Sequence, residues 1–147
     1  MEVKDLYKCF IDTGGLIALL DVSDPYHKES SAFYNSLKKS TLLFTSTLVI
    51  SETYTWLLYH CGHSLANRFL GIIENAIKTG YIRSIIPDND LINKTHAVLR
   101  AYEDQNLSYP DAMSFVIVEL YDIQNIFGFD NHFYIIKRNL WPHIKKR

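Results

Sequence analysis

The chain has 147 residues, of which 48% are apolar and 21% charged, and its net charge at pH 7 is −1. This composition predicts one globular domain over residues 1–147 and excludes a disordered or collagen-like chain. A nearly neutral chain has no global basic field for nucleic acid, so the binding of a polyanion must depend on local clusters of charge.

Cysteine usage and hydropathy predict where the protein acts. Cys9 and Cys61 are too few for a disulfide scaffold or a thiolate metal site, and they indicate a reducing compartment. The N-terminal segment has no apolar run of signal-peptide length, and no stretch reaches the roughly 18 consecutive apolar residues of a membrane span. We therefore expect a cytoplasmic protein without a membrane segment.

Short apolar runs that predict strands alternate along the chain with longer segments that predict helices. Asp12-Thr13-Gly14-Gly15 has the pattern of a turn, and Asp24-Pro25 that of an N-cap followed by Pro at the first helical position. The expected strands are residues 6–11, 41–45, 81–86 and 125–129, with an edge strand near 140–144. The expected helices are residues 16–20, 24–39, 47–60, 64–78, 88–104 and 108–122, followed by a short helix beyond residue 130. This alternation predicts an α/β fold, a three-layer α/β/α sandwich with a mostly parallel central sheet.

Three aspartates lie where such a sheet binds ligands, beyond the carboxyl ends of its strands. Asp12 directly follows the first expected strand, Asp130 directly follows the fourth, and Asp111 lies in the first turn of a helix. Each also has an ordinary structural interpretation. Asp12 and Asp130 can be turn or cap residues, and Ser108-x-x-Asp111 matches a capping box.

Glu52 is the only formally charged residue between Ser40 and Asn67, and it lies in an apolar helical segment. A carboxylate with little polar surface around it is costly unless it is paired, protonated or bound to a cation. No Lys or Arg lies within a helical turn or two of it in the sequence. We therefore expect Glu52 to have a functional role.

The four carboxylates of Asp12, Glu52, Asp111 and Asp130 can converge on one crevice of a doubly wound sheet. They cannot all ionise at close range without a compensating cation. Ligand sets made only of oxygen suit Mg²⁺ or Mn²⁺ rather than zinc. Such a cluster is the usual apparatus of phosphoryl chemistry.

Four short segments follow one another along nearly the whole chain. They are Asp12-Thr13-Gly14, Ser51-Glu52-Thr53, Leu107-Ser108-Tyr109-Pro110-Asp111-Ala112 and Phe129-Asp130-Asn131-His132-Phe133. This ordered set resembles the PIN-domain ribonucleases, and within them the toxin-like VapC group. The departures are Gly128, where Ser or Thr is frequent, and Asn131 and His132, where a second acid is frequent. They affect a second metal position rather than the first.

The resemblance implies a role for each site residue. Asp12 and Asp111 would be direct ligands of Mg²⁺ or Mn²⁺, Asp130 and Glu52 would act mainly through bound water, and Thr13 and Ser46 would line the site. The catalytic set is therefore Asp12, Glu52, Asp111 and Asp130, and the metal set is Asp12, Asp111 and Asp130. His132 is expected on a helix surface, with contact to a phosphate or to a metal-bound water as the alternative.

The function implied by the resemblance is hydrolysis of RNA by an activated water, leaving a 5′-phosphate and a 3′-hydroxyl. The alternative is a non-catalytic RNA- or protein-binding domain on the same fold. A receiver, an aspartyl phosphatase or a dinucleotide-binding fold would need other residues after the first strand than Asp12-Thr13-Gly14-Gly15.

Two further features concern partners. Five of the fifteen basic residues lie in the last eleven positions and are expected RNA contacts, with a solvated tail as the alternative. These residues are Lys137, Arg138, Lys145, Lys146 and Arg147. The aromatic, nearly uncharged stretch from Ser40 to Asn67 predicts a homodimer. The resemblance implies an antitoxin protein that packs against the early helices.

Overall fold

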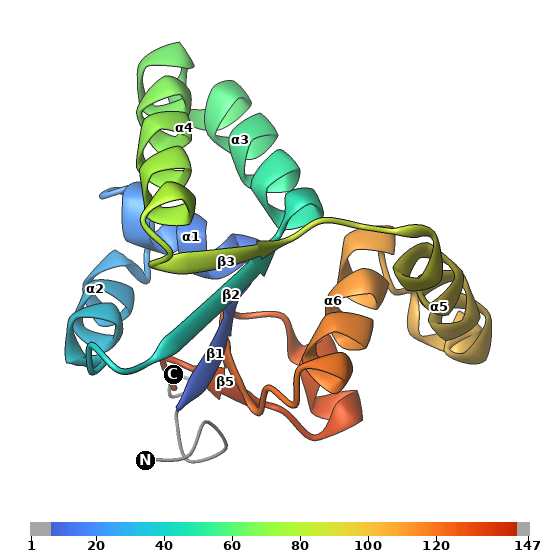
Figure 1. Ribbon diagram of the computed structural model, residues 1–147. Coiled ribbons are helices and arrows are strands. Elements are labelled where there is room, and N and C mark those ends of the chain that lie inside the picture. Colours follow the sequence, from blue (N-terminus) through green and yellow to red (C-terminus); the bar gives the residue numbers. More distant parts are fainter. Residues whose placement is uncertain (1–6, 144–147) are drawn as a thin grey trace.

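The computed structural model describes residues 7–143 and has a five-stranded sheet at its centre (Figure 1). The strands follow the order β3-β2-β1-β4-β5, and every neighbouring pair is parallel. Their bounds are β1 Lys8–Ile11, β2 Leu42–Ser46, β3 Ile82–Ile85, β4 Asn125–Phe127 and β5 Asn139–Trp141. β1 is central, and Cys9, Phe10 and Ile11 are all buried, as expected for a parallel strand covered on both faces. The predicted α/β sandwich is confirmed, with a sheet that is entirely parallel over these strands.

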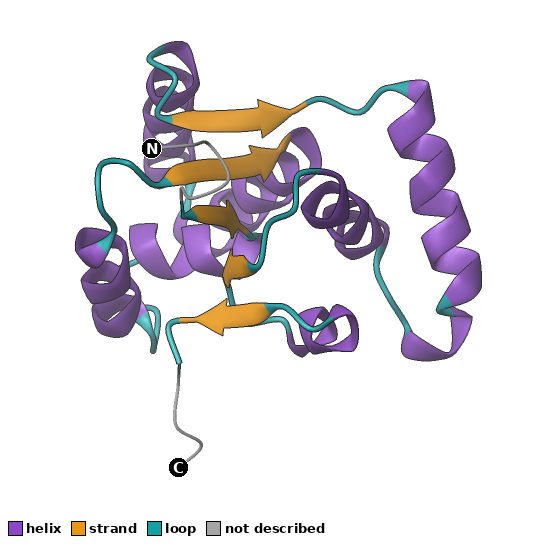
Figure 2. Cartoon of the chain, turned by 60° about the horizontal axis from the view of Figure 1, so that its bottom comes forward, coloured by secondary structure: helices purple, strands orange, loops and turns teal. Residues whose placement is uncertain are grey.

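Helices cover both faces of the sheet (Figures 1 and 2). On one face lie α1 (Thr13–Leu20) and α2 (His27–Ser36), which connect β1 to β2, and α3 (Thr47–Cys61) and α4 (His63–Lys78), which connect β2 to β3. The return from β3 to β4 crosses the other face through α5 (Asn89–Ala101), η2 (Glu103–Gln105) and α6 (Tyr109–Leu120). A short helix, η3 (Asn131–Ile136), joins β4 to β5. Within the described part of the chain, no helix has the length and apolarity needed to span a membrane.

The strands are added on one side of β1 first and on its other side afterwards, so the order of the sheet switches between the neighbouring strands β1 and β4. Successive connections lead from β1 outward to β3, and the long return then places β4 on the opposite side of β1. The Asp12 N–H donates to the Phe127 carbonyl oxygen at 2.9 Å, which ties the carboxyl ends of these two strands together. This is the topological switch point at which open α/β sheets bind their ligands.

Two local predictions were wrong. Gly14 and Gly15 belong to the first turn of α1 rather than to a loop, and a Cβ at Gly15 would overlap the ring and carbonyl oxygen of Phe127. Gly15 therefore allows α1 to lie directly against β4. Asp24 does not cap α2, which begins at His27; its carboxylate accepts from the Tyr26 N–H at 2.8 Å in the preceding turn.

Candidate active site

Asp12 lies at the switch point with its side chain turned into the protein. It occupies the N-cap position of α1 without a side-chain cap bond, and it is 7% exposed. A Cβ at Gly128 would lie 2.9 Å from the Asp12 Cβ, so the glycine after β4 leaves room for this aspartate. The interpretation of Asp12 as a helix-capping side chain therefore finds no support in its contacts.

The pKa of the Asp12 carboxyl is shifted by its burial and by three neighbouring acids. Burial, joined by the charges of Asp111, Asp130 and Glu52, raises the pKa of its carboxyl from 3.8 to about 8. A hydrogen bond from the Thr13 backbone opposes this rise. The four predicted carboxylates thus lie near enough to repel one another, and a cation at the site would relieve that repulsion.

Asp111 caps its helix, as the sequence predicts, and also lies against the other acids of the site. Its backbone N–H donates to the Ser108 Oγ at 3.1 Å, and its carboxylate accepts from the Ser108 N–H at 3.4 Å, which completes a capping box at the start of α6. Burial, the charge of Asp130 and a hydrogen bond with Asp130 raise the pKa of the Asp111 carboxyl to about 6, against the lowering effect of Ser108. The capping box therefore holds Asp111 facing Asp130.

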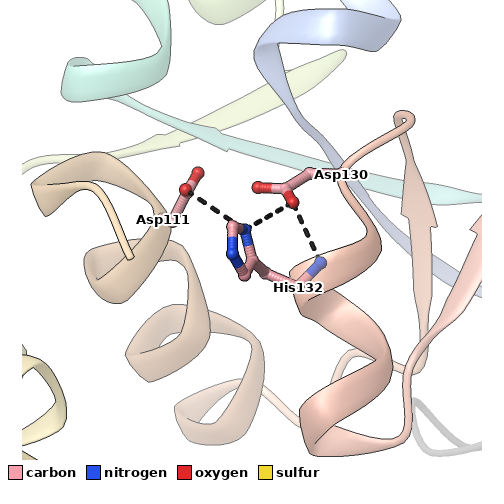
Figure 3. Close-up of side chains that lie close together, drawn as sticks. All are labelled: Asp111, Asp130 and His132. Atoms are coloured by element: carbon pink, nitrogen blue, oxygen red, sulfur yellow. Dashed lines mark hydrogen bonds and ion pairs between the residues drawn. The ribbon is translucent and has the colours of Figure 1, made fainter. Parts of the chain in front are cut away.

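Asp130 and His132 complete the cluster from the segment after β4 (Figure 3). Asp130 Oδ1 accepts from the His132 backbone N–H at 2.9 Å and lies 2.8 Å from His132 Nδ1. His132 Nδ1 is also 3.8 Å from Asp111 Oδ2, and one donor atom from each of the three residues lies within 4.8 Å of the others. Asp12 is not a member of this tightest group within the described residues. The expectation of a helix-surface role for His132 was wrong; the only sequence signal was its spacing of two residues from Asp130.

Glu52 reaches the site by a different route from the one expected. It is exposed rather than enclosed by apolar helix surface, so the expectation of a buried lone acid was wrong. Its Oε1 accepts from the Thr13 hydroxyl at 2.6 Å, and its charge acts on Asp12. Ser46 is buried, and its Oγ accepts from the Val49 N–H at 3.2 Å to cap α3, the helix that carries Glu52.

The expected basic contacts separate into three groups. Arg138 is 8% exposed, and its guanidinium donates to the carbonyl oxygens of Ile123 and Ile136 and pairs with Glu119 at 3.3 Å. It supports the fold, and its burial corrects the expectation that it binds RNA. Lys137 is exposed beside it. The predicted contacts Lys145, Lys146 and Arg147 lie outside the described residues.

The residues at this site fit a divalent cation. Four carboxylates and one imidazole converge from α1, α3, α6 and the segment after β4, without a Lys or Arg among their partners in the part of the chain that the structure describes. A bound cation would lower the raised pKa of Asp12 and would give the buried His132 Nδ1 a partner, which it lacks among the described residues. Asp12, Asp111 and Asp130 would supply hard oxygen ligands of the kind that Mg²⁺ and Mn²⁺ prefer.

Comparisons with known proteins give matches over most of the chain. The PIN domain family matches residues 9–139. The 23S rRNA-specific endonuclease VapC20 of Mycobacterium tuberculosis is 28% identical over 125 residues, covering 84% of this chain and 90% of the relative.

Solved structures resemble the fold. The crystal structure of Mycobacterium tuberculosis VapC20, a Sarcin-Ricin loop cleaving toxin, superposes with a TM-score of 0.77 at 28% identity, covering 87% of this chain and 94% of that chain. FitAcB from Neisseria gonorrhoeae superposes with a TM-score of 0.60 at 11% identity over 91% of this chain and 96% of that chain, which shows the shared fold alone. The family match spans most of the chain and includes all four acidic residues of the site, so this protein belongs to the PIN domain family.

Proposed function

We propose that the protein is a divalent-metal-dependent endoribonuclease that works with Mg²⁺ or Mn²⁺. The observation that carries the proposal is the convergence of Asp12, Asp111, Asp130 and Glu52 at the switch point, where the pKa of Asp12 is raised to about 8. Similarity to an rRNA endonuclease over 84% of the chain supports RNA as the substrate.

Each side chain has a distinct task in this proposal. Asp12, Asp111 and Asp130 would hold the cation, which when bound supplies activation of water and stabilisation of the leaving oxygen. The Ser108 capping box fixes the direction of Asp111, and the backbone N–H of His132 fixes Asp130. Because these hydrogen bonds orient the carboxylates before substrate binds, the carboxylates need little rearrangement to hold a cation.

Glu52 is placed to accept a proton. The Thr13 hydroxyl holds Oε1, while the carboxylate as a whole is exposed to solvent at the site. An attacking water that loses its proton to Glu52 needs no protein nucleophile and leaves no covalent intermediate. The products of this in-line hydrolysis are a 5′-phosphate and a 3′-hydroxyl.

A cleavage assay separates this function from its alternative, a non-catalytic RNA- or protein-binding domain. The wild type is incubated with tRNA and rRNA fragments, including the 23S rRNA sarcin–ricin loop, with EDTA, with Mg²⁺ and with Mn²⁺. We expect cleavage only with a metal, and a loss of at least about a hundredfold in rate for Glu52→Gln with RNA binding retained. RNA binding without cleavage under any metal condition would favour the alternative.

We further propose that the protein acts in the cytoplasm as the toxin of a toxin–antitoxin pair. The support is its similarity to VapC20, whose structure is described as that of a cleaving toxin. Induced expression of the wild type should arrest growth, while Asp12→Asn should not. Co-expression of a small DNA-binding protein encoded beside it should restore growth. If the protein cleaves RNA in vitro but its expression does not arrest growth, it is a housekeeping nuclease.

A further inference from the structure

His132 Nδ1 is a buried atom whose surroundings offer it no hydrogen. The atom is inaccessible to solvent and makes no well-aligned hydrogen bond within the described chain, although Asp130 Oδ1 is 2.8 Å away. That oxygen already accepts from the backbone N–H of the same histidine at 2.9 Å. An Nδ1 that carries no hydrogen therefore faces carboxylate oxygens, which cannot donate a hydrogen bond to it.

The opposite ring nitrogen determines which tautomer is present. His132 Nε2 lies 3.0 Å from the carbonyl oxygen of Gln105, the last residue of η2. A carbonyl oxygen can only accept, so Nε2 carries the hydrogen and a neutral ring has its lone pair on Nδ1. This is the arrangement by which proteins orient metal-binding histidines, with the remote N–H held by a carbonyl or a carboxylate.

Three lone-pair atoms thus meet around one point, as Figure 3 shows. They are His132 Nδ1, Asp130 Oδ1 and Asp111 Oδ2, with Nδ1 at 2.8 Å and 3.8 Å from the two oxygens. Adjacent ligands of an octahedral ion with bonds of about 2.1 Å lie about 3 Å apart. The 2.8 Å between Nδ1 and Asp130 Oδ1 is close to this spacing, and Asp111 Oδ2, at 3.8 Å from Nδ1, lies somewhat farther away.

We propose that His132 is a direct ligand of the divalent cation through Nδ1. The inference rests on the proposed function and deepens it, because it names the class of ion that the site selects. An imidazole ligand favours later transition metals such as Co²⁺ or Zn²⁺ over Mg²⁺, which prefers oxygen and water. The oxygen-only site predicted from the sequence becomes a mixed nitrogen and oxygen site.

Equilibrium binding of Co²⁺ and of Mg²⁺, measured by calorimetry on the metal-free protein, tests this selectivity. His132→Asn keeps the backbone N–H that donates to Asp130 but removes the imidazole lone pair. We expect this variant to lower the ratio of Co²⁺ to Mg²⁺ affinity by about tenfold or more. His60→Asn, at the far end of α3 with its ring bonded to the Trp56 carbonyl, is the control and should keep the wild-type ratio.

Nitrogen NMR of the imidazole side chains gives a readout independent of activity. On addition of Zn²⁺ we expect the His132 Nδ1 resonance to move to the position of a metal-bound nitrogen while Nε2 remains protonated. An unchanged affinity ratio in His132→Asn together with an unmoved Nδ1 would overturn the proposal and leave the nuclease function standing. Absence of any divalent-cation binding by the wild type would instead overturn the proposed function.

Discussion

Asp111 and Asp130 show how one side chain can satisfy a local and a distant requirement together. Asp111 closes the capping box with Ser108 and also faces Asp130. Asp130 is the N-cap of η3, where its side chain accepts from the His132 N–H, and it contacts the imidazole with the same oxygen. The capping and functional interpretations are therefore compatible, because a carboxylate has several lone-pair positions to share among partners.

Asp12→Asn should change the pH dependence of stability in the metal-free protein. Burial raises the pKa of Asp12 in the folded state from 3.8 to about 8, so the folded protein binds an extra proton in this range. Its free energy of unfolding then falls as pH rises from about 4 to about 8, by an amount of the order of a few kcal/mol. Asn removes that loss. Urea unfolding at several pH values with EDTA measures the difference, and Asp111 contributes a residual slope in both proteins.

The same variant should lose cleavage and most of its response to metal. The wild type should gain about 2.7 kcal/mol when Mn²⁺ is a hundredfold above its Kd, by ligand linkage. Asp12→Asn should gain much less and should not cut RNA. If Asp12 were only a turn residue, the variant would keep both its cleavage and its metal response.

At the scale of elements, the site depends on how closely α1 lies against β4. Gly15 allows this contact, since a Cβ there would overlap both the side chain and the backbone of Phe127. The helix end that carries Asp12 and Thr13 is thereby placed beside the strand that leads to Asp130. A helix displaced from β4 would separate the two halves of the acidic cluster.

Gly15→Ala should destabilise the fold by about 1–3 kcal/mol, as overpacking typically does, and should weaken metal binding as well. Gly71→Ala is a matched control, because it lies inside α4 with nothing within 4 Å of its expected Cβ. That change should stabilise by about 0.5–1 kcal/mol through the helix preference of Ala. Thermal melts of both variants test this prediction. Equal melting temperatures of Gly15→Ala and Gly71→Ala would contradict a close approach of α1 to β4.

At the scale of the whole molecule, α3 presents exposed aromatic surface. Tyr59 is 79% exposed near the end of this helix, while Trp56 and Leu48 are only partly buried. Apolar surface of this kind on a small domain favours self-association. We expect a homodimer by light scattering at tens of micromolar, weakened by Tyr59→Ser but not by Tyr134→Ser on η3. A wild type with a strictly monomeric mass would disprove this expectation.

The basic C-terminal residues should contribute a sequence-independent part of RNA binding. Replacing Lys145, Lys146 and Arg147 together by Ala should weaken binding of all RNA sequences alike. It should reduce the slope of log affinity against log salt by about 0.7 for each RNA phosphate that the variant no longer neutralises. Lys38 and Lys39 precede β2 and so lie near the amino ends of the strands, whereas the site lies at their carboxyl ends. Their double Ala variant is therefore the control. An unchanged slope in the triple variant would identify the tail as solvated charge.

The order of elements and the identity of the four acids follow from the sequence alone. Apolar runs, Ser108 before α6 and Asp88 before α5 are local signals, and the structure uses both residues as helix caps. Asp12 and Asp130 could be assigned to strand ends because parallel strands bring their carboxyl ends to one edge. Such features depend on neighbours within a few positions, which a sequence displays directly.

Burial, side-chain direction and tautomer were decided only by the tertiary structure. Glu52 is exposed because α3 turns it toward Thr13. Arg138 is buried, and the carbonyl oxygen of Ile123 accepts a hydrogen bond from its guanidinium. His132 faces the acids because Gln105, far away in sequence, holds its other nitrogen. Each of these contacts joins segments that only folding brings together, so no pattern of neighbouring residues contains them.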